Sequence, residues 1–313
     1  MNKIIFDDLR SFNKSATDSS LKSYTSSILK ICSDLGHKNE CSPTLFKDPK
    51  VIFKLIENQK LTTQKNKLVS VLVYLQAKGY NKDIIEIYND KIYSLLGKIR
   101  IQTEKNEYTD KERDNLLTMD EIVLLGVRLK KELPSVLIKF NDFNSYMKYL
   151  IIELASRYPL RNDWVDMKMI EPNDKSIFNK NFNYMIIDKD VIKFKIFKYK
   201  TVKSHGEIDF ETKDKDLINI ILKYYKNAKE YYEENDKDFE GWFLFKRNFE
   251  PLSRNLFTHW LQNLFYSETQ KKLSSSMLRK ITTSNLLDIK KFKELSRIQG
   301  HSIAEALTTY TKH

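Results

Sequence analysis

The sequence predicts an α+β fold that is mainly helical and carries a small antiparallel β-sheet, arranged as two domains. Apolar residues recur at helical spacing over most of the chain. Only residues 183–210 combine β-branched and aromatic residues in the alternating pattern that is typical of strands. A polar stretch at 103–117 interrupts the helical pattern, and 313 residues are enough for a domain on each side of it.

The first predicted domain, residues 1–102, contains three apolar series at helical spacing. They cover residues 19–36, 62–79 and 83–97. Each series begins at Ser, Thr or Asp and ends at or near Gly, which are the residues preferred at the two ends of a helix. Because nothing in this part of the sequence alternates like a strand, we predict a compact helical domain.

Residues 103–117 are the best candidate for a linker, because they are highly polar and lack periodic apolar residues. One solvated face of a helix would produce the same pattern, and the sequence leaves this alternative open. Thr118 is followed at the third position by Glu121, which is the spacing of a capping box at the start of a helix. We therefore place the second domain at residues 118–313.

The second domain is predicted to mix helices with strands. Ile192, Phe194 and Ile196 alternate with lysines, as in a strand with one buried face. The Gly206 turn precedes another alternating piece at 207–210, so we expect a sheet of two or three strands. Helices are expected around this sheet at 120–131, 141–157, 214–234, 253–266, 276–286 and 288–298.

The net charge of +12 and the pI of about 9.3 predict a polyanionic partner. Both halves contribute, with 20 Lys and Arg against 15 Asp and Glu up to residue 115, and 34 against 27 beyond it. Nucleic acid is favoured over a membrane surface, because the basic residues are spread along the chain instead of forming one cluster. No apolar run resembles a membrane-spanning helix or a signal peptide, so we expect an intracellular protein without membrane contact.

Cysteine and glycine usage argues against several kinds of site. Cys32 and Cys41 are too few for a disulfide framework and wrongly spaced for a zinc site, which predicts a reducing compartment. The chain has only 7 glycines and holds neither a G-x-x-x-x-G-K-S/T nor a G-x-G-x-x-G phosphate-binding loop. We therefore expect no catalysis driven by nucleotide hydrolysis, no cofactor and no metal ion.

The C-terminal region carries three residues suited to phosphate chemistry: Arg279, His301 and Tyr310. The ordinary pKa of a tyrosine side chain is about 10, so a phenol is a poor nucleophile unless charged donors surround the phosphate that it attacks. Arginine and histidine are donors of this kind. The combination indicates a phosphoryl-transfer site in which Tyr310 is the nucleophile.

Two upstream residues extend this candidate site. Arg161 follows a Tyr-Pro-Leu turn, where its guanidinium fork can meet a phosphate, and Asp163 is placed to brace that fork. Lys200 ends the alternating strand, where a lysine can donate a proton to a leaving oxygen. Taken singly, each of the two basic residues is also explained as solvated surface. Lys198 and Lys203 remain rivals of Lys200.

Together and in this chain order, these side chains resemble the active site of the tyrosine recombinase (phage-integrase) family. The matching stretches are Pro-Leu-Arg-Asn-Asp-Trp, Lys-Tyr-Lys-Thr, Ser-Met-Leu-Arg-Lys-Ile-Thr-Thr-Ser-Asn-Leu, and Gly-His-Ser followed by Thr-Thr-Tyr. They contribute, in order, Arg161, Lys200, Arg279, His301 and Tyr310. The resemblance covers residues 117–313 as a catalytic domain and, more weakly, residues 1–115 as a helical core-binding domain. It implies a two-domain DNA clamp.

The resemblance implies site-specific DNA strand exchange, as by a recombinase or integrase. Arg161 and Arg279 would hold the non-bridging oxygens of the scissile phosphate, and His301 would add a hydrogen bond. Tyr310 would attack phosphorus and become linked to the DNA 3′ end, while Lys200 protonates the departing 5′ oxygen. Because the phosphotyrosine bond keeps the energy of the broken phosphodiester, rejoining needs neither ATP nor metal. The implied partners are double-stranded DNA and a homotetramer on two paired DNA sites.

Two departures from the family pattern qualify this implication. The second arginine box usually has a histidine three residues before its arginine, and Ser276 stands there, so removal of the tyrosine proton is unassigned. His205 and His259 are candidates to replace that histidine, although each is also explained as structural or solvent-exposed. The first box offers Asp163 and Asp166 where the family usually has a glutamate.

Two other hypotheses remain open. One is a type IB topoisomerase-like strand-passing enzyme with a similar cluster, and the other is a DNA-binding protein that keeps the fold with weakened catalysis. The helical first half and the position of Tyr310 favour the recombinase. The Lys-, Asn- and Ile-rich composition points to an AT-rich genome such as that of a virus or mobile element. The expected location is wherever the DNA lies: cytoplasm or nucleoid, nucleus, or viral factory.

Overall fold

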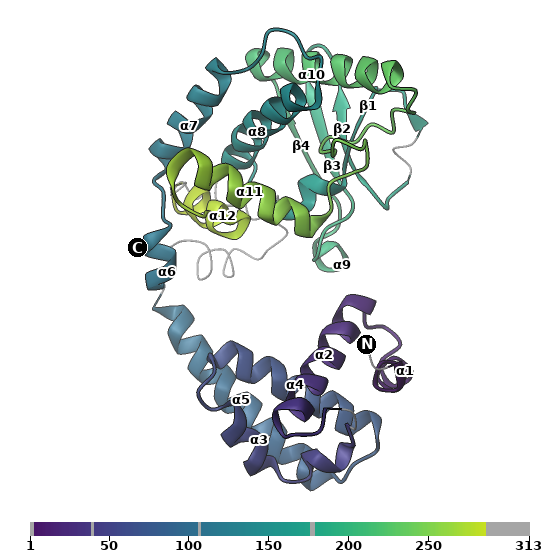
Figure 1. Cartoon of the computed structure of the whole chain (residues 1–313), viewed down its shortest axis with the longest axis vertical. Helices are drawn as coiled ribbons and strands as arrows, with labels where there is room; N and C mark the ends of the chain where they lie inside the picture. The colour runs from purple at the N-terminus through teal and green to yellow at the C-terminus, as the bar shows by residue number, and fades with distance from the viewer. Residues whose placement is uncertain (1–2, 39–40, 106–107, 176–178, 286–313) are drawn as a thin grey trace. The chain divides into compact units, whose positions relative to one another are not determined.

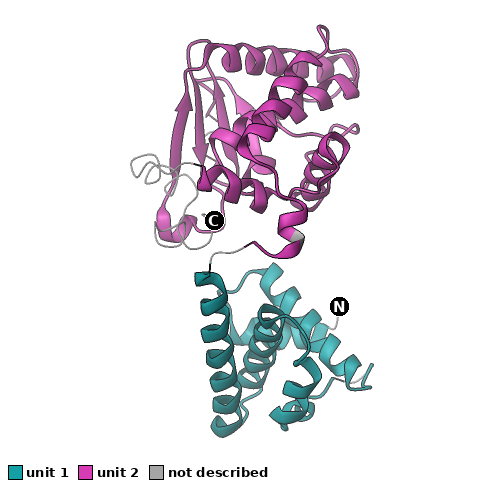
Figure 2. Ribbon diagram, turned by 90° about the vertical axis from the view of Figure 1, so that its left-hand side faces the viewer, with its two compact units in different colours: residues 1–105 teal, residues 106–313 magenta. Residues whose placement is uncertain are grey.

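The computed structural model describes residues 3–38, 41–105, 108–175 and 179–285. The chain divides into two compact units, Met1–Lys105 and Asn106–His313 (Figure 2). Each unit has a hydrophobic core of its own. In the described part, the first unit is wholly helical and the second combines helices with one sheet. The predicted helix at 288–298 lies outside the described residues.

The first unit is built from five α-helices and one 3-10 turn within its described residues. They are α1 (Lys3–Phe12), α2 (Asp18–Asp34), η1 (Pro43–Phe46), α3 (Pro49–Ile56), α4 (Leu61–Ala77) and α5 (Lys82–Glu104) (Figure 1). The three predicted helices correspond to α2, α4 and α5. However, α5 continues past Gly97, which has a helical conformation there, because one interior glycine costs a helix only about 1 kcal/mol.

The core of the first unit forms where α4 and α5 pack together. Tyr88 is fully buried there, and its hydroxyl donates to the Phe46 carbonyl at 3.0 Å, so the ring is buried without losing its hydrogen bond.

Cys32 and Cys41 form a disulfide with Cα atoms 5.6 Å apart, a usual separation. This bond was not expected from the sequence, because two cysteines alone do not reveal that the chain after α2 folds back onto that helix.

The second unit contains helices around a four-stranded sheet. The helical elements are α6 (Asp110–Asp114), α7 (Met119–Lys131), α8 (Phe140–Arg157), η2 (Asn162–Asp166), α9 (Val202–His205), α10 (Lys215–Glu234), α11 (Arg254–Thr269) and α12 (Ser275–Ser284) (Figure 1). The strands are β1 (Met167–Ile170), β2 (Asn183–Ile187), β3 (Ile192–Ile196) and β4 (Ile208–Thr212). The predicted class, mainly helical with a small sheet, is confirmed.

The sheet is mixed, whereas an antiparallel sheet of two or three strands was predicted. Its order is β1-β2-β3-β4, with β1 parallel to β2 and the remaining pairs antiparallel. Strand β1 was not predicted, because its four residues, Met-Lys-Met-Ile, are too short to display alternation. This strand follows η2 directly, so it fixes the first arginine box to the edge of the sheet.

The core of the second unit surrounds α8, which packs against α7, α10 and α12. Leu150, Ile151 and Ile152 are consecutive and all buried, as expected for a helix covered on every side. The predicted capping box is confirmed, since the Glu121 amide donates to Thr118 and the Thr118 amide donates to Glu121. Within the stretch predicted as a linker, α6 packs onto this unit through an ion pair between Glu112 and Lys280.

Candidate active site

The first arginine box occupies the sharp turn between α8 and β1. Tyr158 precedes a proline, which disfavours a helical backbone at this residue, and α8 ends at Arg157. Arg161 then caps η2, and its side chain is half-buried. Trp164 is fully buried and meets the edges of Phe194 and Phe243, with ring centroids 6.0 and 6.4 Å away. Arg161 therefore extends from a segment that the core holds in place.

The second arginine box lies on α12, and the structure brings it against the first. Arg279 is 2% exposed, and its Nε donates to the Pro159 carbonyl at 2.9 Å, across 120 residues of sequence. Ser275, one turn earlier on the same helix, donates from Oγ to Asn162 Oδ1 at 2.6 Å. Both bonds connect α12 to the turn that carries Arg161. The two predicted phosphate-binding boxes are therefore neighbours in the fold.

A buried carboxylate lies among the guanidinium groups of this region. Asp163 is 3% exposed and accepts a hydrogen bond from Arg254 Nη2 at 3.1 Å. Burial raises the pKa of the Asp163 carboxyl, and the positive charges of Arg254, Arg161 and Arg279 counteract that rise. Three guanidinium groups and two carboxylates, Asp163 and Asp166, leave a net positive charge in this region, which suits an anionic ligand such as a phosphate.

The hairpin lysines differ in their surroundings. Lys198 Nζ lies 2.8 Å from Asp166 Oδ1, so this ammonium already has a counter-charge. Lys200 is exposed, and its ammonium makes no ion pair within the part of the chain that the structure describes. Lys203 is exposed on the short helix α9. Lys198 is therefore set apart by its counter-charge, whereas neither Lys200 nor Lys203 makes an ion pair among the described residues. The choice of Lys200 as the proton donor remains a prediction.

The remaining predicted residues are distributed as follows. Ser276 is exposed on the first turn of α12. His205 ends α9 and His259 lies on α11, and both are exposed, which favours the solvent-exposed interpretation of each. His301 and Tyr310 lie outside the described residues.

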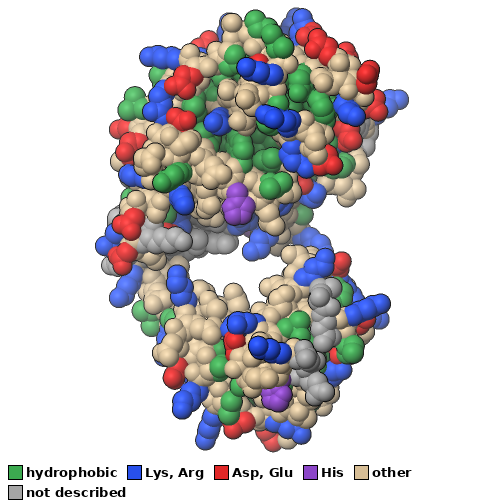
Figure 3. All heavy atoms as spheres, in the orientation of Figure 1, with side chains coloured by type: hydrophobic (Ala, Val, Ile, Leu, Met, Phe, Trp, Pro, Cys, Tyr) green, Lys and Arg blue, Asp and Glu red, His purple; other side chains and the backbone are tan. Residues whose placement is uncertain are grey.

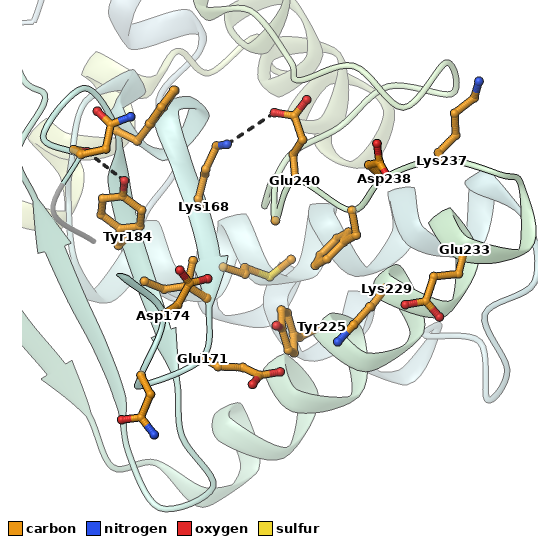
Figure 4. Close-up of a pocket in the computed structure, with 17 residues that line it drawn as sticks. Lys168, Glu171, Asp174, Tyr184, Tyr225, Lys229, Glu233, Lys237, Asp238 and Glu240 are labelled. Atoms are coloured by element: carbon orange, nitrogen blue, oxygen red, sulfur yellow. Dashed lines mark hydrogen bonds and ion pairs between the residues drawn. The ribbon is translucent and has the colours of Figure 1, made fainter. Parts of the chain in front are cut away.

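A cavity of about 680 Å³ lies beside β1 and the end of α10, and it does not match the predicted site (Figure 4). Arg161, Lys200 and Arg279 do not line it. Lys168 enters it between aromatic rings, 4.4 Å from the Trp242 centroid, and pairs with Glu240 at 3.4 Å. Its charged lining consists of Glu171, Asp174, Glu233, Asp238, Glu240, Lys168, Lys229 and Lys237. Because acids outnumber lysines, this cavity is a poor site for a polyanion.

The visible surface of each unit carries charges of both signs (Figure 3). Lys and Arg side chains are spread over the visible face of each unit and are interspersed with Asp and Glu (Figure 3).

Among the described residues, no three His, Cys, Asp or Glu side chains gather as a metal site requires. Within the same part of the chain, no helix has the length and apolar character needed to cross a bilayer.

Several residues that organise the site were not singled out from the sequence. Arg254 pairs with both Asp163 and Asp166, and Asn162 joins Ser275 to Thr258. The only local signal for Arg254 was its position directly after Ser253, the N-cap of α11. That signal predicts where a helix starts and does not reveal which distant carboxylates its first residue meets.

No protein-family model and no curated protein sequence matches the chain. Among solved structures, it is similar to the crystal structure of XerA recombinase, with 12% identity, 99% of this chain and 94% of that chain covered, and a TM-score of 0.43. It is also similar to XerH site-specific recombinase bound to difH substrate in a pre-cleavage complex, with 13% identity, 99% and 90% coverage and a TM-score of 0.49. A third similar structure is the post-cleavage complex of XerH bound to palindromic difH substrate. It has 12% identity and a TM-score of 0.48, with 97% of this chain and 90% of that chain covered. Each is a recombinase by name, but these similarities are low, so function is inferred from this chain's own residues.

Proposed function

We propose that this protein is a site-specific DNA recombinase or integrase that cleaves and rejoins strands through a covalent 3′-phosphotyrosine intermediate. The contact between the two arginine boxes supports this function most directly. Arg279 donates to the Pro159 carbonyl, and Ser275 donates to Asn162, so Arg161 and Arg279 extend from adjoining segments. Guanidinium groups fixed near each other can bind the two non-bridging oxygens of one phosphate.

The proposed reaction is a transesterification. The Tyr310 oxygen attacks phosphorus as its proton passes to solvent, and the bond from phosphorus to the DNA 5′ oxygen breaks. That oxygen keeps the bonding electron pair and takes a proton from the Lys200 ammonium, which leaves a 5′-hydroxyl. Arg161, Arg279 and His301 stabilise the charge that develops on the non-bridging oxygens. The reverse steps rejoin the strand.

The proposed partner is double-stranded DNA, and the proposed assembly is a homotetramer on two paired sites. The net charge of +12 suits the first part of this proposal, because phosphate contacts supply most of the non-specific affinity for DNA. The tetramer follows from the motif resemblance. The proposed location is wherever the target DNA lies.

A covalent-trapping experiment tests the proposal. Nicked duplexes with randomised sequence around the nick are incubated with the full chain, denatured in SDS, and any protein-linked strands are sequenced. Wild-type protein is expected to give a 3′-linked adduct with a preferred sequence, and Tyr310→Phe none, although it still binds DNA. Adduct formation is expected to persist in EDTA. An adduct formed by Tyr310→Phe would assign the nucleophile elsewhere, and a strict Mg²⁺ requirement would indicate another chemistry.

Ser276 favours one alternative, a DNA-binding protein with weakened catalysis. It stands where the family usually has a histidine, and a hydroxyl titrates poorly near neutral pH. In the trapping experiment this alternative gives binding without an adduct. A topoisomerase-like enzyme gives an adduct with little sequence preference and relaxes supercoiled plasmid as a monomer.

A further inference from the structure

The stem of the lysine hairpin is joined to the first arginine box by a buried amide. Asn183, at the start of β2, is fully buried. Its Nδ2 donates to the Asp163 carbonyl at 3.0 Å and to the Lys198 carbonyl at 3.2 Å. Its Oδ1 accepts from the amides of Phe197 and Lys198 at 3.0 and 2.7 Å. This side chain therefore connects the backbone of both predicted motifs.

A charged contact joins the same two motifs through side chains. Asp166 is 14% exposed, and its Oδ1 lies 2.8 Å from Lys198 Nζ. Its Oδ2 accepts from Arg254 Nε at 2.9 Å and from Nη2 at 2.5 Å. One oxygen of Asp166 is thus bonded to Arg254, the first residue of α11, and the other is paired with Lys198 of the hairpin. Because Arg254 also pairs with Asp163, its guanidinium is fixed by two carboxylates.

The position of Lys200 depends on these contacts, because its side chain starts two residues after Lys198. Tyr199, between the two lysines, is buried, and its hydroxyl donates to the Gly206 carbonyl at 2.6 Å. The exposed lysines therefore flank an inward-pointing tyrosine that closes the loop. Lys198 is therefore held by Asp166 at one end of this loop, and Gly206 is held by Tyr199 at the other.

We propose that Asp166 is a positioning residue for protonation of the leaving 5′ oxygen: by holding Lys198, it presents Lys200 to the scissile phosphate. This inference rests on the proposed function. Without Asp166, the Lys198 ammonium, which is 47% exposed, would turn to DNA phosphates and draw the loop with it. A displacement of about 1 Å in a catalytic group can lower a rate by about 100-fold.

A sulfur-substituted substrate isolates the protonation step. Two nicked duplexes of the sequence selected by covalent trapping are compared, one with the ordinary 5′ oxygen at the scissile phosphate and one with sulfur in its place. With sulfur, the bond from phosphorus to sulfur breaks and a thiolate departs with the electron pair. Thiols ionise near pH 8.5 in model compounds, far below alcohols, so a thiolate leaves without a proton donor. A variant that only misplaces Lys200 should therefore regain its rate on the sulfur substrate.

The variants separate the hairpin from the rest of the cluster. Lys200→Ala is expected to slow adduct formation about 100-fold on the oxygen substrate and to match wild type on the sulfur substrate. Asp166→Asn and Lys198→Met are each expected to lose about tenfold on oxygen and to recover on sulfur. Asp166→Glu keeps the charge and should recover most of the oxygen rate.

The matched control is Asp209→Asn. Asp209 pairs at 3.1 Å with Lys195, which lies five residues before Lys200 on the same hairpin, and it is more exposed than Asp166. It should behave as wild type on both substrates.

The outcomes separate this inference from the proposed function. If wild type forms no adduct on either substrate, the proposed function fails and the inference fails with it. If wild type and Lys200→Ala behave as stated, two results overturn the inference alone. Asp166→Asn could match wild type on oxygen, or it could be slowed equally on both substrates, which would place its effect in phosphate binding or folding. Lys198→Met leaves the bonds between Asp166 and Arg254 in place, so it repeats the test where Asp166→Asn fails to fold.

Discussion

Arg279 and Lys200, two basic residues predicted to act on one phosphate, occupy opposite environments. Arg279 is almost fully buried on α12 and is fixed by a hydrogen bond to the Pro159 carbonyl. Lys200 is exposed in a loop, and its ammonium has no ion pair within the described residues. One side chain is part of the core of its unit, whereas the other is attached to that core only through its neighbours.

The difference fits the two tasks proposed for these residues. Charge stabilisation gains from donors that are fixed before the substrate arrives, because no reorganisation is then needed during the reaction. Proton donation requires the donor to reach a leaving oxygen that belongs to the DNA. The buried Arg279 suits charge stabilisation, and the exposed Lys200 suits proton donation. The comparison therefore predicts that substitutions at the two residues will differ in their effects on folding.

The largest expected effect is that of Arg279→Ala. Adduct formation on the selected nicked duplex should fall about 1000-fold, because a preformed charge donor is lost. The free energy of unfolding should fall by about 2 kcal/mol, because a charged hydrogen bond is lost and Asp163 loses a compensating cation. Tryptophan fluorescence reports this for the second unit alone, since Trp164, Trp242 and Trp260 are the only tryptophans in the chain.

Arg279→Lys is the control for charge. One ammonium cannot both bond to the Pro159 carbonyl and hold a phosphate through two parallel hydrogen bonds, so it should recover only part of the rate. If Arg279→Ala forms the adduct at the wild-type rate, Arg279 does not act on the phosphate. The contrast drawn between Arg279 and Lys200 would then be wrong.

Lys200→Ala should separate rate from stability. Adduct formation on the ordinary oxygen substrate should fall about 100-fold through loss of the proton donor. The free energy of unfolding should change by less than about 0.5 kcal/mol, because the side chain is exposed. A clear loss of stability would show that Lys200 has a structural role, and an equal rate loss at Lys203→Ala would leave the donor unassigned.

The elements near these residues were predictable where local chemistry decides them. Thr118 and Glu121 mark a helix start by their spacing, and the alternation at Ile192, Phe194 and Ile196 marks β3. Such signals need only neighbours in sequence. By contrast, β1 is too short to alternate, and its place is decided by pairing with β2.

The candidate site was predictable in its residue types and not in its connections. Arg161, Lys200 and Arg279 were selected because their chemistry suits a phosphate. That Arg279 meets Pro159, and that Arg254 meets Asp166, depends on contacts across 120 and 88 residues. No periodicity encodes contacts of this length, because the packing of whole helices determines them. The role of Asn183 was hidden for the same reason, since its amide resembles any other strand residue until β2 and β3 are paired.

Ser275→Ala tests whether the contact between the arginine boxes matters as a unit. It removes the hydrogen bond to Asn162 and should lower the free energy of unfolding by about 1 kcal/mol. The rate of adduct formation should fall less than for Lys200→Ala, because Arg279 keeps its bond to Pro159. Ser276→Ala, on the exposed side of the same turn, is the control for stability and should leave unfolding unchanged. Equal destabilisation by the two serine variants would mean that the loss reflects helix propensity instead of the contact.

The smallest expected effect concerns Lys280, a lysine that contrasts with Lys200. Lys280 follows Arg279 on α12, and its ammonium pairs with Glu112 of α6. Burial alone would raise the pKa of the Glu112 carboxyl, but hydrogen bonds from Lys280 and Thr109 lower it to about 2. Because the folded-state pKa lies below the unfolded value, the ionised carboxylate stabilises the fold above about pH 4.5. This contribution is lost as pH falls toward 2.

Glu112→Gln should therefore lower the free energy of unfolding by about 1 kcal/mol at pH 7, after allowance for solvent screening of a partly exposed pair. The difference from wild type should shrink steadily between about pH 4.5 and pH 2, as followed by tryptophan fluorescence in urea. Glutamine still completes a capping box, so the change isolates the charge. Glu121→Gln is the matched control at the same helix position of α7, where the carboxylate is more exposed, and it should cost less. If the difference in unfolding free energy between Glu112→Gln and wild type stays constant with pH, the Glu112 side chain acts through packing. The ion pair with Lys280 would then contribute nothing to stability.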